Sequence, residues 1–397
     1  MAVYGKRKLL IRIAAIGVSL VIWGVLDFSS AQVCKVGYCN DAFHMKHRKK
    51  FRVKHPVYHH GFLPNVSVMD RWGDSWYPIK TNSLGFKDAV NREVSLKSDA
   101  YRLLFIGDSF TEGEGLIYEK GYVGQLQTSL KDKGVEVLNA GVSSYAPAVY
   151  YAKVRHLLET VGLEVDNVIV FIDMSDIWDE ANWYTLGDDD VVYTRGTKAK
   201  HVTRKVFGKG VGNWLKENSL TVTFAYRLRD WIVHQRRLWG WKTNGNPTKP
   251  EYFNAELWLN KVSKTRETEW CFEDEDWDSW GKRGVDNALK NMDQLYRFLK
   301  QRGVRLTVGI YPWPSNILNG DNPSRHSKVW HKWTERNGVD LIDLFPQFID
   351  NGGAKEMIVT NFIPYDIHWN AKGHALVAET FLEYFKERSE SNQGKGE

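Results

Sequence analysis

Two short motifs near opposite ends of the chain carry the side chains best suited to catalysis. Ser109 lies in the run Gly-Asp-Ser-Phe-Thr-Glu-Gly at 107–113, and Asp366 and His368 lie in the run Asp-Ile-His-Trp-Asn at 366–370. Together the motifs provide a hydroxyl, an imidazole and a carboxylate, the three groups that turn a serine into a nucleophile able to attack an ester. The presence of both motifs in one chain therefore predicts a catalytic serine.

Each of the three side chains has an expected role. Ser109 would be the nucleophile, and His368 would be the base that accepts its proton. Asp366 would bond the far ring nitrogen and fix the tautomer of the imidazole. The alternative for Gly-Asp-Ser is an ordinary helix cap, because serine and aspartate favour that position. A single histidine is also more often structural, so only the combination of the motifs favours catalysis.

Strands and helices alternate on both sides of a long irregular stretch. The expected strands are 102–106, 135–138, 168–172, 305–310 and 339–342. The expected helices are 122–132, 148–161, 285–302, 328–337 and 371–386. This alternation implies an α/β fold with a parallel sheet covered on both faces. Ligands bind beyond the carboxyl ends of such strands, and Ser109 directly follows the first one.

The chain divides into six expected segments. The core occupies 98–176 and 285–390, and the long insertion or cap at 177–284 separates its two parts. The other segments are a leader at 1–30, an irregular lead-in at 31–97 and a flexible tail at 391–397. The stretch between Asp176 and Gly284 is polar and holds ten of the 17 tryptophans. Exposed tryptophans stack on ligands, although most tryptophans fill a core.

The first 30 residues decide the expected location. Basic residues at 6–8 precede the uncharged run 13–26, a pattern typical of a signal peptide or a signal anchor. Residues 9–28 approach the ~20 residues needed to cross a bilayer, and small residues at 29–31 offer a cleavage site. A buried core helix is the alternative. We expect the body to be exported to the periplasm or the exterior, either anchored by this helix or secreted after cleavage.

Composition argues against several other functions. Apolar residues make up 43% and charged residues 26%, as in a folded globular protein. A net charge of +6 is small for 397 residues, and no nucleic-acid-binding signature is present, so nucleic acid is not an expected partner. There is no P-loop, dinucleotide fingerprint or His-Glu-x-x-His helix. No metal or organic cofactor is implied, and His55, His59 and His60 are interpreted as a solvated loop.

The two motifs resemble those of the SGNH hydrolase superfamily, also called GDSL esterases and lipases, in a bacterial, membrane-anchored or exported form. The resemblance covers residues from about 100 to 175 and from about 285 to 388. It implies a flavodoxin-like three-layer α/β/α sandwich with a five-stranded parallel sheet. It also implies that Ser109, His368 and Asp366 form the catalytic triad.

The resemblance further implies an oxyanion hole formed by the backbone N–H groups of Ser109 and Gly141 and by a third donor. The family usually has Gly-x-Asn-Asp after the third strand, but this chain has Asp-Met-Ser-Asp at 173–176. Ser175 thus replaces the asparagine donor, and Asp173 replaces the glycine. A serine hydroxyl also donates, but it is shorter. Either Ser175 serves, or another group does, or the site is weakened.

Three functions stay open on this basis. The leading expectation is a serine esterase that forms an acyl-enzyme, with an acetyl ester on a glycan as its favoured substrate because sugars stack on tryptophan. Lipid esters come next. The second is a polysaccharide O-acyltransferase with the same triad, in which a sugar hydroxyl replaces water. The third is a non-catalytic glycan-binding protein on this fold, which the departure at Ser175 supports.

Overall fold

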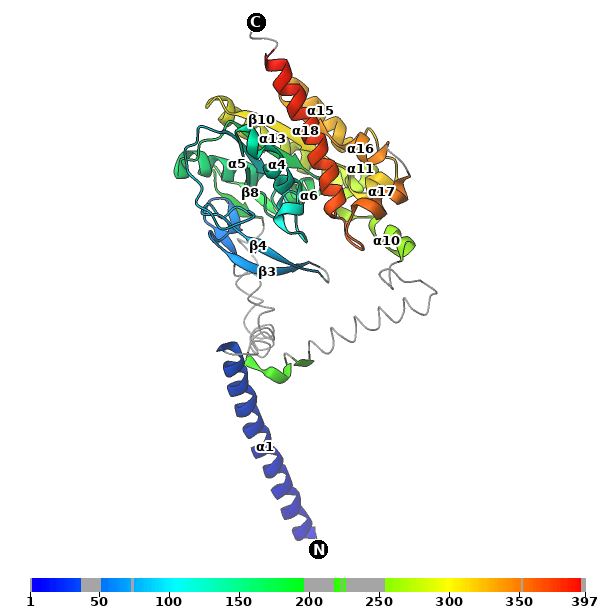
Figure 1. The fold of residues 1–397 in the computed structure, drawn as a ribbon. Helices are drawn as coiled ribbons and strands as arrows, with labels where there is room; N and C mark the ends of the chain where they lie inside the picture. Colours follow the sequence, from blue (N-terminus) through cyan, green and yellow to red (C-terminus); the bar gives the residue numbers. More distant parts are fainter. Residues whose placement is uncertain are drawn as a thin grey trace. The chain divides into compact units, whose positions relative to one another are not determined.

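The computed structural model describes residues 2–36, 51–72, 75–195, 218–222, 224–225, 254–350 and 353–393 (Figure 1). It separates into two units, one made of 1–50 and 196–253 and the other of 51–195 and 254–397. The first unit begins with helix α1 (Ala2–Val36), whose stretch Ala15–Val33 has a mean hydropathy of 1.5. This helix is long and apolar enough to be a signal anchor or a signal sequence.

The second unit is built on the five-stranded parallel sheet that the sequence predicts. Its strands are β5 (Tyr101–Ile106), β6 (Val135–Asn139), β7 (Asn167–Ile172), β10 (Arg305–Ile310) and β11 (Asp340–Asp343). Each agrees with its expected bounds to within one residue at either end. The strand order is β11-β10-β7-β5-β6, which in chain order is the flavodoxin-like arrangement 2-1-3-4-5.

Helices cover both faces of this sheet, which confirms the expected three-layer sandwich. Helices α4 (Tyr122–Leu130) and α18 (Ala371–Gln393) pack together on one face. Helices α5 (Pro147–Arg155), α6 (Met174–Asn182) and α13 (Lys282–Lys300) pack together on the other. The right-handed crossovers of parallel strands require this division.

Further helices complete the second unit. They are α3 (Ser109–Glu112), α11 (Glu269–Phe272), α12 (Asp274–Asp276), α14 (Pro314–Leu318), α15 (Arg325–Asn337), α16 (Phe345–Ile349) and α17 (Ala354–Asn361). Single 3-10 or π turns lie at Tyr118–Lys120, Lys131–Lys133, His156–Val161, Arg266–Thr268 and Trp277–Gly281. Helix α18 continues to Gln393, so part of the expected flexible tail is helical, and residues 394–397 lie outside the described residues.

The lead-in differs from the irregular segment expected, because it forms two antiparallel hairpins. They pair β1 (Arg52–His55) with β2 (His59–Phe62), and β3 (Ser67–Trp72) with β4 (Ser75–Lys80). Such strands are hard to detect in sequence because each has only four to six residues and lacks a clear apolar alternation. The histidines at 55, 59 and 60 belong to the first hairpin and are partly buried, so they are not a solvated loop.

The described parts of the insertion contain one hairpin and one helix in addition to the short helices above. The hairpin pairs β8 (Tyr184–Leu186) with β9 (Val192–Thr194), and the helix is α10 (Ala255–Val262). Trp258 and Trp270 are completely buried, whereas Trp183 is 53% exposed. Three of the six described tryptophans of the insertion, Trp258, Trp270 and Trp280, are therefore buried, and four others at 214, 231, 239 and 241 lie outside the described residues.

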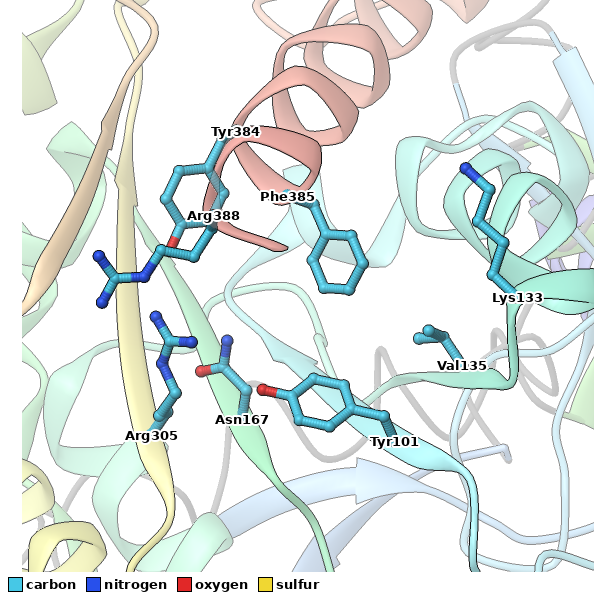
Figure 2. A pocket seen from close by; sticks show the side chains of 8 residues that line it. All are labelled: Tyr101, Lys133, Val135, Asn167, Arg305, Tyr384, Phe385 and Arg388. Atoms are coloured by element: carbon cyan, nitrogen blue, oxygen red, sulfur yellow. The ribbon is translucent and has the colours of Figure 1, made fainter. Parts of the chain in front are cut away.

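A pocket of about 520 Å³ lies at the amino ends of the sheet strands (Figure 2). Its lining comes from the first residues of four strands, from Lys133 and from the last part of α18. The residues are Tyr101, Lys133, Val135, Asn167, Arg305, Tyr384, Phe385 and Arg388. Ser109 follows the carboxyl end of β5, so the pocket and the candidate nucleophile lie at opposite ends of the same strand.

Candidate active site

Ser109, His368 and Asp366 form a continuous chain of hydrogen bonds. Ser109 Oγ lies 2.8 Å from His368 Nε2, and His368 Nδ1 lies 2.5 Å from Asp366 Oδ1. Ser109 and His368 are 259 positions apart in the sequence, and the fold alone brings them together. Both are buried, at 8% and 7% exposure. The hydroxyl, imidazole and carboxylate are thus arranged as a proton relay requires.

The turn after β5 places Ser109 at the start of helix α3. Asp108 is the N-cap, and its carboxylate accepts the backbone N–H of Phe110 at 3.0 Å. Gly107 is required here because a Cβ atom at this position would lie 2.1 Å from Thr111 Oγ1. The helix-cap interpretation of the motif is therefore correct for Asp108, while the serine beside it faces the imidazole.

A tight turn explains how Asp366 and His368 act on one another only two residues apart. Asp366 Oδ1 accepts the backbone N–H groups of Ile367 and His368 at 2.7 and 3.0 Å, which folds the loop around the carboxylate. The other oxygen, Oδ2, accepts the indole N–H of Trp72 at 2.8 Å. These bonds hold the carboxylate in a fixed position beside the imidazole.

The electrostatics of the pair suit a general base. Burial alone would raise the pKa of Asp366, but the hydrogen bonds and charge of His368 lower that pKa below its ordinary value. Burial alone would lower the pKa of His368, but Asp366, and less strongly Glu114, raise that pKa above its ordinary 6.5. The pair therefore stabilises the imidazolium that forms when the serine loses its proton.

Two of the expected oxyanion donors are bonded elsewhere. The backbone N–H of Gly141 donates to Asn139 Oδ1 at 3.0 Å, and the hydroxyl of Ser175 donates to Asp173 Oδ1 at 2.7 Å. Glycine is needed at 141 for packing, since a Cβ atom would lie 2.7 Å from a methyl carbon of Thr111. The third, the N–H of Ser109, is in the first turn of α3, where no intrahelical acceptor exists.

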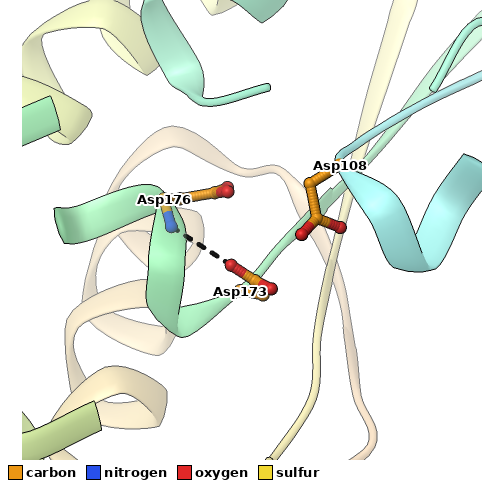
Figure 3. Close-up of side chains that lie close together, drawn as sticks. All are labelled: Asp108, Asp173 and Asp176. Atoms are coloured by element: carbon orange, nitrogen blue, oxygen red, sulfur yellow. Dashed lines mark hydrogen bonds between the residues drawn. The ribbon is translucent and has the colours of Figure 1, made fainter. Parts of the chain in front are cut away.

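Three buried carboxyl groups lie close together, and one of them belongs to Asp108, the neighbour of Ser109 (Figure 3). Oxygens of Asp108, Asp173 and Asp176 lie within 4.8 Å of one another. The described partners are neutral hydroxyl, indole and amide donors, including Tyr311 on Asp108 and Tyr150 on Asp176. Burial and then the charge of Asp173 raise the pKa values of Asp108 and Asp176 well above their ordinary range. The raised pKa values favour the neutral, protonated form of these two groups, which lowers the repulsion within the cluster.

The raised pKa of Asp108 affects which group accepts the hydroxyl proton of Ser109. Ser109 Oγ lies 3.1 Å from Asp108 Oδ2 and 2.8 Å from His368 Nε2, so two acceptors face one hydroxyl proton. A neutral carboxyl group is a weaker acceptor than a carboxylate. The raised pKa of Asp108, caused first by burial and then by Asp173, therefore leaves the imidazole as the better acceptor.

A buried ionic network below α3 was missed by sequence reasoning. Arg52, in β1, donates to both carboxylate oxygens of Glu112 at 2.7 and 2.6 Å. Lys87 donates to the carbonyl oxygens of Gly113 and Leu116 at 2.8 and 3.0 Å. Burial opposes the charge of Glu112, but Arg52 lowers the pKa of that carboxyl below its usual value. Arg52 and Lys87, both from the lead-in, thus hold helix α3, which begins at Ser109, in place.

Comparisons with known proteins give a fold-level similarity. No protein-family model matches the chain, and no curated protein matches it. Among solved structures, the acetyl xylan esterase AlAXEase is similar over 71% of this chain and 98% of its own, at 15% identity and a TM-score of 0.37. A member of the lipolytic G-D-S-L family from Veillonella parvula DSM 2008 covers 72% and 99%, at 11% identity and a TM-score of 0.38.

A catalytic mutant of Axe2, an acetylxylan esterase from Geobacillus stearothermophilus, is also similar. It covers 73% of this chain and 95% of its own, at 14% identity and a TM-score of 0.37.

Proposed function

We propose that this protein is a serine esterase of the SGNH type that cleaves an acyl ester through an acyl-enzyme intermediate. The observation that carries the proposal is the unbroken relay from Ser109 Oγ to His368 Nε2 at 2.8 Å and from His368 Nδ1 to Asp366 Oδ1 at 2.5 Å. A serine hydroxyl is a poor nucleophile until a base takes its proton, and this arrangement supplies the base.

The reaction would proceed in two halves. Ser109 Oγ bonds to the acyl carbon while His368 Nε2 takes the hydroxyl proton, and that proton then passes to the leaving alcohol as its bond to the acyl carbon breaks. Water next attacks the acyl-enzyme, gives a proton to His368, and releases the acid while the proton returns to Ser109. Asp366 stays ionised throughout and stabilises the imidazolium.

For the substrate we propose an acetyl ester carried on a glycan outside the cytoplasm. Two exposed aromatic side chains support the glycan, Trp183 next to β8 and Tyr193 in β9, at 53% and 47% exposure. Their ring faces are of the kind on which sugar rings stack. Helix α1 supports an anchored or exported protein, because its stretch Ala15–Val33 is long enough to cross a membrane.

One observation favours transfer to a second alcohol in place of water. The reacting side chains Ser109 and His368 are 8% and 7% exposed, and exclusion of water from a site favours acyl transfer over hydrolysis. A polysaccharide O-acyltransferase is therefore the second candidate. The relay weighs against the non-catalytic alternative, which has no use for an aligned base.

An ester assay tests the proposal directly. The full chain in detergent should hydrolyse p-nitrophenyl acetate, and Ser109→Ala should lose this activity by ~10³-fold or more. A fluorophosphonate probe should label the wild type and fail on the variant. Equal turnover by the wild type and Ser109→Ala would refute an activated serine. Acetyl incorporation into an added oligosaccharide that exceeds hydrolysis would identify the transferase.

A further inference from the structure

The loop that carries Asp366 contains a strained residue. Tyr365 has a φ angle of +64°, in the left-handed region that a bulky side chain rarely adopts. Such a conformation persists only where the surrounding structure holds it in place. The groups that hold this loop therefore decide whether Asp366 keeps its position behind His368.

Helix α10, at the end of the insertion, binds this loop at three points. The backbone N–H of Asn254 donates to the hydroxyl oxygen of Tyr365 at 2.6 Å, and Lys261 Nζ donates to the carbonyl oxygen of Tyr365 at 3.2 Å. The indole N–H of Trp258 donates to the carbonyl oxygen of Asp366 at 3.2 Å. Trp258 is completely buried, so its ring is fixed by packing.

The lead-in binds the same residue from another direction. The indole N–H of Trp72, the last residue of β3, donates to Asp366 Oδ2 at 2.8 Å. This is the oxygen that the imidazole does not use. The ring of Trp72 also lies edge-on to that of His368, with centroids 5.1 Å apart and an interplanar angle of 86°. One side chain thus contacts both members of the acid–base pair.

We propose that Trp72 and Trp258 are positioning residues of the relay. Their indole N–H groups, from the lead-in and the insertion, hold the carboxylate and the backbone of Asp366 so that the imidazole of His368 stays aimed at Ser109. This inference rests on the proposed esterase function. It assigns a role in the site to two segments that lie outside the parallel sheet and the helices that cover its faces.

Trp72→Phe and Trp258→Phe test the proposal, because phenylalanine keeps an aromatic ring and removes only the donor and part of the ring. We expect kcat for p-nitrophenyl acetate to fall roughly ten- to hundredfold for Trp72→Phe, and KM to change less than about twofold. Trp258→Phe should show the same pattern with a smaller loss. The matched control is Trp333→Phe, which removes an indole bond to the carboxylate of Asp293 at 2.7 Å far from the relay.

A double-mutant cycle separates positioning from general damage. In an Asp366→Asn background, the relay is already broken, so adding Trp72→Phe should cost almost nothing further. An equal loss in both backgrounds would show that Trp72 contributes only to packing. So would a loss of kcat as large in Trp333→Phe as in Trp72→Phe.

A spectroscopic measurement keeps the inference independent of activity. The proton in the short bond between His368 and Asp366 should give a far-downfield ¹H NMR signal, absent in His368→Gln. We expect Trp72→Phe to broaden or remove this signal and Trp333→Phe to preserve it. If the wild type shows the signal but no ester turnover, the proposed function fails while the positioning role can still be tested. An unchanged signal in Trp72→Phe overturns the inference.

Discussion

The two ends of the parallel sheet handle charge in opposite ways. At the carboxyl ends, Asp108 and Asp173 lie together in full burial with neutral donors around them (Figure 3). At the amino ends, Arg305 and Arg388 (Figure 2) have side chains that are 34% and 45% exposed. Both approach one carboxylate, that of Asp340, at 2.5 and 3.2 Å.

The two ends differ in how their charged groups affect the free energy of unfolding. Opposite charges near solvent, as at Asp340, add little stability and cost little. Like charges in a dry interior are unfavourable, and burial and the charge of Asp173 accordingly raise the pKa values of Asp108 and Asp176. Such clusters are typical of places where acid–base chemistry occurs. The cluster at the carboxyl end therefore supports the proposed reaction there, whereas the ion pair between Arg305 and Asp340 at the amino end joins β10 to β11.

The largest expected effect comes from removing the base. His368→Gln should lower kcat/KM for p-nitrophenyl acetate by ~10³-fold or more, because the serine loses its proton acceptor. Arg388→Gln, at the other end of the sheet, should leave kcat/KM within about twofold of the wild type. Steady-state kinetics on both variants checks this, and a His368→Gln enzyme with a tenth of the original activity would contradict the relay.

The pH dependence should give the next largest effect. The base must be neutral to act, and Asp366 raises the pKa of His368 above 6.5 against the opposing effect of burial. Activity should therefore fall about tenfold per pH unit below that raised pKa, so the acid limb of kcat/KM lies above pH 6.5. A profile measured from about pH 5 to pH 9 tests this. A limb centred below 6.5 would show that the pair is not coupled.

Asp176→Asn should stabilise the protein. The folded pKa of Asp176 is raised by burial and then by Asp173, so the wild type loses stability as pH rises above the ordinary value of 3.8. An amide binds no proton, and it can still accept the Tyr150 hydroxyl. We expect a gain of about 1–2 kcal/mol at pH 8 and less at pH 4. Denaturant unfolding at pH 4 and pH 8 measures this change in the free energy of unfolding. A loss of stability at pH 8 would contradict the raised pKa of Asp176.

Asp340→Asn should have the smallest effect and the opposite sign. It removes the carboxylate that Arg305 and Arg388 share, in a place where water screens the charges. We expect a loss of about 0.5–1 kcal/mol, which should shrink in 1 M salt because of screening over about 3 Å. The same unfolding experiment measures this. A loss above about 3 kcal/mol would mean that Asp340 and its two arginines behave as a buried ion pair and are not screened by water.

The core strands were predictable because burial on both faces leaves a direct mark on composition. Residues 168–172 are Val, Ile, Val, Phe and Ile, and all are buried in β7. The Ser109, Asp366 and His368 motifs were detectable because few other roles require those types in that context. The lead-in hairpins were not, because strands of four to six residues that mix polar and apolar side chains without alternation leave no periodic pattern.

Partners that depend on distant packing could not be found from sequence. Trp72 and Asp366 are 294 positions apart, and one tryptophan among 17 has no local feature that marks it. Gly141 shows the reverse case, where a local motif was present but the side chain of Asn139 occupies the N–H that was expected to be free. Short sequence motifs predict which residues carry groups suited to the chemistry. Side-chain packing decides which of those groups are free to bind a substrate.

The bond between Arg52 and Glu112 has a practical consequence for anyone shortening this protein. These residues are 60 positions apart, and Glu112 lies in the same short helix as the nucleophile. A fragment that began at β5, the first strand of the parallel sheet, would bury the carboxylate of Glu112 without Arg52. A fragment intended for expression should therefore begin before residue 51. The ion pair between Arg52 and Glu112 thus places the start of the folded domain well before β5.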